Sequence, residues 1–289
     1  LEPNFFIVGG SKCGTTNISY YLNLHPKVFF SELNEPYYFC KWDLSNNFKR
    51  ESMIRDEVKY LELFKNAKTE KVIGEATPSY LHSPNSAYKI KERFPDSKII
   101  ISIRNPIERA HSGYFSNEFM RKDNLSFREM IDSHKKLIDK NEFYIYNILE
   151  PGFFSKHIKR FQDNFASDKI KVIVFEDYVE NTEKSLESIL EFLELDTDFE
   201  FTEQPKRGYR IPKNKISKMT LENKTIRKLS TFFIPTVTRQ QIGERFMLKE
   251  TEKPVMSLKE RNYLKEIYED DVKKLEILLH RDLPWLDFH

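Results

Sequence analysis

The chain has 289 residues, of which 39% are hydrophobic and 32% are charged, and it contains 24 phenylalanines. A chain of this length folds as one large domain or as two, and its apolar content is sufficient for a sizeable core. The 47 basic residues nearly balance the 45 acidic ones, leaving a net charge of +2. Net charge therefore gives no reason to expect a nucleic acid partner, although a local basic pocket is compatible with it.

The sequence contains no membrane or disulfide signal. No apolar run approaches the roughly 20 residues of a bilayer span, and no charged-then-apolar signal segment opens the chain. Cys13 and Cys40 are the two cysteines, too few for a disulfide framework, which suits a reducing compartment. We therefore expect a cytoplasmic protein without a transmembrane segment. Because the first residues already resemble a core strand, we expect that any upstream extension has been lost or trimmed.

The stretch from Asn4 to Asn17 organises the rest of the chain. Its first half is a short apolar run, typical of a buried strand, that breaks at Gly9-Gly10. A helix follows, which Thr15 and Thr16 can cap. Free backbone N–H groups and the positive end of the helix dipole converge at such a turn, and Lys12 adds a full charge. The stretch therefore predicts a phosphate cradle.

This loop departs from a regular Walker A sequence. That motif needs lysine directly after its last glycine, whereas here Thr15 follows Gly14 and Lys12 precedes it. An ordinary βα turn with a solvated lysine is the alternative. The sequence G-G-S-K-C-G-T-T-N resembles instead the 5′-phosphosulfate loop of sulfotransferases that use 3′-phosphoadenosine 5′-phosphosulfate (PAPS). The residues that the resemblance assigns to this nucleotide are Ser11, Lys12, Cys13, Gly14, Thr15, Thr16 and Asn17.

A carboxylate follows the next predicted strand. Lys27–Phe30 is a short strand candidate, and Glu35-Pro36 is unlike a helix because proline pushes its predecessor towards extended backbone. At a strand exit, Glu35 would lie on the sheet edge where open α/β folds bind ligands. Taken alone, it is better explained as a surface residue beside aromatic side chains. The segment resembles the E-P-[HY]-[YF]-F segment of carbohydrate-type sulfotransferases, which implies that Glu35 is the general base.

A helical pattern within residues 42–68 predicts an outer helix or a lid. The next segment, Lys71–Leu81, is a short strand that runs into a loop. It resembles the E-[KA]-[ST]-P-x-Y segment that lies beside the acceptor in the same family. Some eukaryotic relatives carry lysine where this chain has Ala76, so a second active-site cation is missing or supplied elsewhere. Glu75 either orients other groups in the cleft or caps backbone N–H groups at the strand end.

The strongest strand candidate is Lys98–Ile103, which follows a predicted helix. Its nearly continuous β-branched run is typical of a central parallel strand. A helix begins at the proline of the next segment, and this segment resembles the 3′-phosphate motif R-x-P-x-x-R-x-x-S. The resemblance implies that Arg104 and Ser112 bind one phosphate; a structural arginine with a helix-buried serine is the alternative. His111 is expected to pack or to face solvent. A P-loop triphosphatase would offer an acidic magnesium ligand at such a strand end.

Further βα units follow. Apolar positions within 127–138 predict an exposed or lid-like helix, and another helix follows Pro151-Gly152. Lys169–Phe175 is a buried-strand candidate that precedes an amphipathic helix. Glu176 and Asp177 at its end could hold a metal, but capping or loop hydrogen bonds explain them better. These units predict a doubly wound, mostly parallel sheet in an α/β fold.

The last third of the chain contains one candidate nucleotide segment. The basic segment 204–213 is either a solvated linker or the late basic loop that covers the nucleotide in PAPS-dependent sulfotransferases. The latter resemblance assigns Lys206, Arg207 and Gly208 to the nucleotide. A final helix from Ser257 ends near Arg281–Trp285, a segment that resembles bacterial members of the family and is expected to pack structurally.

Residues 1–289 are thus expected to form one sulfotransferase domain with a P-loop-like phosphosulfate-binding turn. The implied reaction is in-line transfer of a sulfuryl group from PAPS to an acceptor hydroxyl or amine, with Lys12 and Glu35 as catalytic residues and without a metal. The acceptor is a carbohydrate, a lipid or another small molecule, selected by loops near 42–53 and 120–146. The alternatives are a P-loop nucleotide-dependent kinase and a non-catalytic nucleotide-binding domain.

Overall fold

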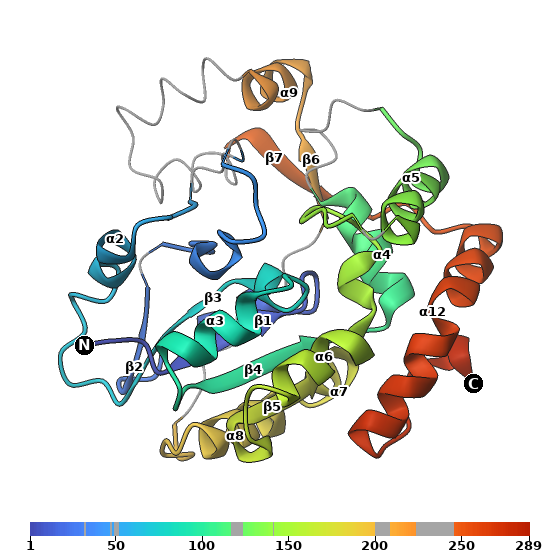
Figure 1. Cartoon of the computed structure of the whole chain (residues 1–289). Helices are drawn as coiled ribbons and strands as arrows, with labels where there is room; N and C mark the ends of the chain where they lie inside the picture. The colour runs from blue at the N-terminus through green and yellow to red at the C-terminus, as the bar shows by residue number, and fades with distance from the viewer. Residues whose placement is uncertain are drawn as a thin grey trace.

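The computed structural model of the chain contains a parallel five-stranded sheet with helices on both faces (Figure 1). The structure describes residues 1–31, 33–46, 48, 52–116, 124–140, 142–199, 209–223 and 246–289. The strand order is β2-β3-β1-β4-β5, which places the first strand at the centre. The bounds are Phe5–Gly9 for β1, Val28–Phe30 for β2, Val72–Ala76 for β3, Lys98–Ile103 for β4 and Ile170–Val174 for β5.

Helices connect the strands of the sheet, and further helices follow its last strand, β5. Their bounds are Thr15–Leu22 for α1, Glu57–Glu62 for α2, Ser86–Arg93 for α3, Pro106–Phe115 for α4, Phe127–Asp139 for α5, Phe154–Gln162 for α6, Phe175–Glu180 for α7, Thr182–Phe192 for α8, Lys215–Glu222 for α9 and Leu258–Leu279 for α12. Short 3₁₀ turns include η1 (Tyr38–Cys40), η2 (Pro78–Tyr80), η4 (Glu150–Gly152), η5 (Ser167–Lys169) and η7 (Leu286–Phe288).

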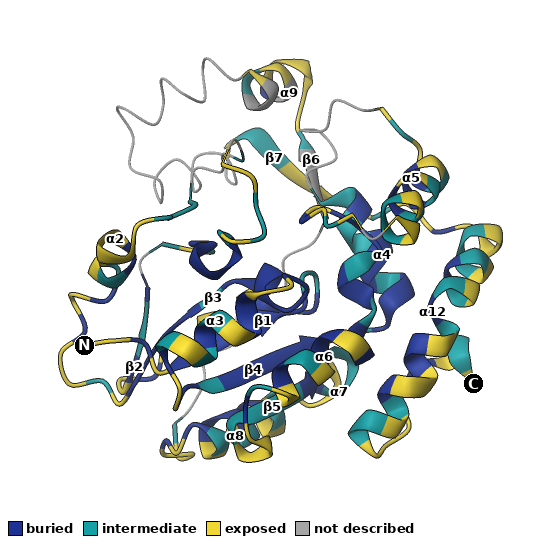
Figure 2. Cartoon of the chain, in the orientation of Figure 1, coloured by how far each residue is buried: buried dark blue, intermediate teal, exposed yellow. Residues whose placement is uncertain are grey.

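Alternate strand residues serve two separate cores, as the two-residue period of a strand requires. Phe6 and Ile101 belong to the core that α3, α4, α6 and α12 cover. Ile7 and Ile100 belong to the core that α1 and α8 cover. Figure 2 shows β1 and most of β4 buried, whereas exposed residues lie on the outer sides of the helices, in the loops and on β7. The doubly wound parallel sheet predicted from the sequence is confirmed.

The start of α1 differs from the sequence-based expectation. Gly14 is the N-cap, with a left-handed backbone at φ 83°, and no side chain caps the helix. Thr15 and Thr16 are the first helical residues rather than caps. Because the chain turns through a left-handed position here, the capping position takes glycine.

Two later segments also differ. The helix α5 is not an exposed lid, since Phe127, Met130 and Ile131 are buried in the core. Its apolar face packs against α4. The end of the predicted basic loop forms a strand, β6 (Tyr209–Pro212), which pairs antiparallel with β7 (Leu248–Thr251). Among the helices in the described part of the chain, none combines the length and apolarity of a bilayer span.

Candidate active site

The phosphate loop leaves β1 at the centre of the sheet and enters α1. A Cβ added at Gly14 would lie 2.8 Å from the ring of Phe175, and its φ is positive, so glycine alone fits without strain. Since no side chain caps the helix, the backbone N–H groups of Thr15 and Thr16 have no acceptor among the described residues. Uncapped N–H groups at a helix start are available to an anion.

Lys12 lies in this loop with a left-handed backbone at φ 69°. That conformation costs a residue with a side chain about 1–2 kcal/mol, and such positions cluster at functional sites. The Lys12 ammonium group donates to Ser116 Oγ at 3.3 Å, at the end of α4. Burial lowers the pKa of Lys12, the negative charge of Glu35 opposes this, and the positive charge of Arg104 lowers the pKa further. Lys12 is therefore a cation on which three segments converge.

Arg104 follows β4 and lies against the same loop. Its Nη1 donates to the carbonyl oxygen of Lys12 at 3.3 Å, and its guanidinium carbon lies 4.7 Å from the centre of the Phe175 ring. The Nε of Arg104 is buried and has no partner among the described residues. A buried donor without an acceptor is costly, and a bound anion would remove that cost. Ser112 lies one helical turn before Ser116, on the α4 face that meets Lys12.

Glu35 lies between β2 and η1, in a segment with unusual backbone geometry. Both Glu35 (φ 53°) and Tyr37 (φ 54°) are left-handed. The Tyr37 hydroxyl donates to Glu35 Oε2 at 2.6 Å, which holds the carboxylate. The negative charge of Glu35 raises the pKa of Lys12, so the carboxylate lies near enough to the phosphate loop to act on this ammonium group. The structure thus brings together Lys12, Arg104 and Glu35, which sequence reasoning selected separately; their chemical roles stay predictions.

Glu75, at the end of β3, is fully buried. Its Oε1 accepts from the hydroxyls of Tyr60 and Tyr80, each at 2.8 Å, and its Oε2 accepts from Thr77 Oγ1 at 2.6 Å. Burial raises the pKa of Glu75 to about 7, although these hydroxyls lower it, and the charge of Glu35 raises it further. The Tyr80 hydroxyl also accepts from the backbone N–H of Phe39 at 3.3 Å. Glu75 therefore orients side chains behind the segment that follows Glu35.

Sequence reasoning missed Lys253. This residue lies half-buried in the connection between β7 and α12. Burial lowers the pKa of Lys253, the positive charges of Arg104 and Lys12 lower it further, and Glu108 opposes them. A third cation therefore lies close enough to Arg104 and Lys12 for their charges to act on it. Its signal in the sequence is a lysine before a proline, which carries no functional information by itself.

Two other polar side chains near the loop have structural roles. Burial raises the pKa of the Cys13 thiol to about 12, so it is not a thiolate at neutral pH. His111 lies edge-on to Phe115 and Phe127, with ring centres 4.9 and 5.3 Å apart, and burial lowers its pKa. His111 was expected to pack or to face solvent, and the structure shows that it packs.

The remaining predicted ligands are not all placed. Lys206, Arg207 and Gly208 lie outside the described residues, so their assignment to the nucleotide stays a prediction. Glu176 accepts hydrogen bonds from the Asn105 backbone N–H and from Trp285, which confirms loop hydrogen bonding for this carboxylate. Across the described ranges, no group of three or more His, Cys, Asp or Glu side chains is arranged to hold a metal ion.

The family model that describes the sulfotransferase domain matches residues 2–276 of this chain. The chain belongs to the sulfotransferase domain family. The chain is 27% identical to a sulfotransferase of solved structure from Alicyclobacillus acidocaldarius, with 98% of each chain covered and a TM-score of 0.75. The family resemblance stated from the motifs is confirmed, and so is the fold class.

Curated relatives match part of this chain in sequence. The membrane-associated sulfotransferase kil1 of Dictyostelium discoideum is 32% identical over 143 residues, which cover 47% of this chain and 29% of kil1. The human bifunctional heparan sulfate N-deacetylase/N-sulfotransferase 2 is 28% identical over 195 residues, covering 66% of this chain and 22% of the relative. The chain thus spans less than a third of the length of either relative.

Proposed function

We propose that this sulfotransferase transfers the sulfuryl group of PAPS to a hydroxyl or amine of a carbohydrate acceptor. The observation that carries the proposal is the contact between Lys12 and Arg104, which follow the neighbouring strands β1 and β4, together with the charge of Glu35 acting on Lys12. The loop N–H groups and Lys12 suit the phosphosulfate. The unpartnered Nε of Arg104 suits a second phosphate, which PAPS carries at its 3′ position and ATP does not.

In the proposed step, the acceptor oxygen or nitrogen attacks sulfur in line with the bond from sulfur to the bridging oxygen. The new bond to sulfur forms as that S–O bond breaks, its electron pair stays on the 5′-phosphate oxygen, and 3′,5′-ADP leaves. Glu35 takes the acceptor proton. Lys12 stabilises the charge that develops on the leaving oxygen, and the loop holds the in-line geometry. We assign charge neutralisation to Lys12, Arg104 and Lys253 rather than to a metal ion.

The carbohydrate acceptor is proposed from two supporting facts. A relative that matches 66% of this chain is named for N-sulfation of heparan sulfate. The Glu35–Phe39 segment also has the sequence typical of carbohydrate-type sulfotransferases. A lipid or another small hydroxyl compound is the alternative acceptor, and a panel containing all three classes distinguishes them.

Nucleotide binding separates this proposal from its rivals. A ligand at a hundredfold excess over its Kd stabilises the folded state by about 2.7 kcal/mol, which raises the melting temperature of a domain of this size by several degrees. We expect this rise with 3′,5′-ADP and not with ATP–Mg²⁺. A rise with ATP–Mg²⁺ alone would favour a kinase. Binding of 3′,5′-ADP without sulfation of any acceptor in the panel would favour a non-catalytic domain.

A further inference from the structure

Two residues at the junction of β5 and α7, Phe175 and Glu176, contact the turn that Arg104 and Asn105 form after β4. The ring of Phe175 lies against the Arg104 guanidinium, 4.7 Å from its carbon. The next residue, Glu176, accepts the backbone N–H of Asn105 on Oε1 at 3.0 Å. Its other oxygen accepts Trp285 Nε1 at 2.9 Å, and Trp285 is only 1% exposed. The peptide unit that follows Arg104 is therefore bonded to a carboxylate that the C-terminal segment holds in place.

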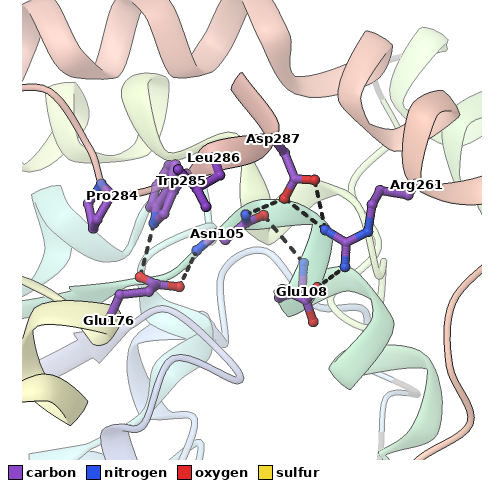
Figure 3. Close-up of a pocket in the computed structure, with 8 residues that line it drawn as sticks. All are labelled: Asn105, Glu108, Glu176, Arg261, Pro284, Trp285, Leu286 and Asp287. Carbon is purple, nitrogen blue, oxygen red and sulfur yellow. Dashed lines mark hydrogen bonds and ion pairs between the residues drawn. The ribbon is translucent and has the colours of Figure 1, made fainter. Parts of the chain in front are cut away.

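A second set of contacts fixes the same turn through the side chain of Asn105. Asp287 Oδ2 accepts Asn105 Nδ2 at 2.7 Å, while both oxygens of Asp287 accept Arg261 Nη1 at 2.7 and 2.8 Å. Arg261 also pairs with Glu108 on α4. Figure 3 shows these side chains around one pocket, with Glu176 between Trp285 and Asn105. Segments far apart in the sequence thus meet at Asn105, the residue that follows Arg104.

We propose that Glu176, held by Trp285, is a positioning residue that sets the preference of the site for a 3′-phosphate. This inference rests on the proposed function. A charge-assisted hydrogen bond to the Asn105 N–H fixes both the strand end that carries Arg104 and the start of the helix that carries Ser112. Loss of that bond lets the Arg104 turn move, and a 3′-phosphate contact depends on its position more than the 5′ contacts of the loop do.

The test compares 3′,5′-ADP with AMP, which lacks the 3′-phosphate, by calorimetry on the whole chain. The variants are Glu176→Ala, which removes both acceptors, and Trp285→Phe, which removes the indole donor and keeps an aromatic ring. The control is Arg281→Gln, which breaks the exposed ion pair of Arg281 with Asp177 at 2.7 Å between the same two segments. We expect Glu176→Ala to weaken the binding of 3′,5′-ADP about tenfold and the binding of AMP by less than about twofold. Trp285→Phe should act in the same direction, and the control should change neither affinity.

A merely structural role predicts a different pattern. Loss of stability alone would weaken the binding of both nucleotides equally, so the ratio of their dissociation constants would not change. Such an unchanged ratio in folded Glu176→Ala would overturn the inference and leave the proposed function intact. A wild-type protein that binds AMP as tightly as 3′,5′-ADP would overturn the proposed function, and the inference with it.

Discussion

The buried carboxyl of Glu75 links the site to the pH dependence of stability. Its pKa in the folded protein is about 7, against an ordinary value of 4.5, chiefly because of burial. The folded state therefore binds this proton more tightly than the unfolded chain does. The gap between the two pKa values corresponds to about 3 kcal/mol. For a carboxyl with a raised pKa, this contribution is present below the unfolded value of 4.5 and is lost as the pH rises through 7.

The substitution Glu75→Gln isolates this contribution. Glutamine is neutral at every pH, has nearly the same shape, and still accepts from the hydroxyls of Tyr60 and Tyr80. Urea unfolding of both proteins across this pH range gives the difference in their free energies of unfolding. We expect that difference to move by about 3 kcal/mol in favour of the variant as the pH rises from about 4 to about 8. A difference that does not vary with pH would refute the reasoning, because every other titrating group is common to the two proteins.

Three further substitutions test the anion site. Arg104→Ala should weaken 3′,5′-ADP about tenfold or more while nearly sparing AMP; equal losses for both nucleotides would contradict a 3′-phosphate role. Lys253→Gln should weaken 3′,5′-ADP by a smaller factor, measured by the same calorimetry, and an unchanged affinity would remove Lys253 from the site. Gly14→Ala should abolish nucleotide-induced thermal stabilisation, because the new Cβ meets Phe175 at a positive φ; stabilisation equal to that of the wild type would refute the fit of the loop.

The sheet and most of the site could be predicted from the sequence because their signals are local. The run Lys98–Ile103 is buried along its length after its first residue, and such burial leaves a continuous apolar pattern. Lys12 and Arg104 follow soon after the ends of β1 and β4, and parallel strands bring these ends to one edge of the sheet. Lys12, Arg104 and Glu35 are therefore close in space although they are far apart in the sequence.

The rest depends on contacts that no local pattern records. Lys253 is included in the site because the charges of Arg104 and Lys12 act on it, and nothing in the sequence around Lys253 indicates this proximity. The apolar face of α5 and the helix α4 could each be predicted from the sequence, but the packing of one against the other could not. The hydroxyls around Glu75 come from two places in the chain, α2 and the η2 turn with its capping residue Thr77. The single-domain organisation and the cytoplasmic location stay predictions.

Single-turnover sulfation by Glu35→Gln tests the transfer step most directly. With PAPS and a carbohydrate acceptor from the panel, we expect the rate to fall by about a hundredfold to ten-thousandfold, the typical contribution of a general base. The affinity of Glu35→Gln for 3′,5′-ADP should remain that of the wild type. Tyr37→Phe, which removes the hydroxyl donor but keeps the carboxylate, should reduce the sulfation rate by a smaller factor than Glu35→Gln does. A wild-type rate in Glu35→Gln would contradict the assignment of Glu35 as the base.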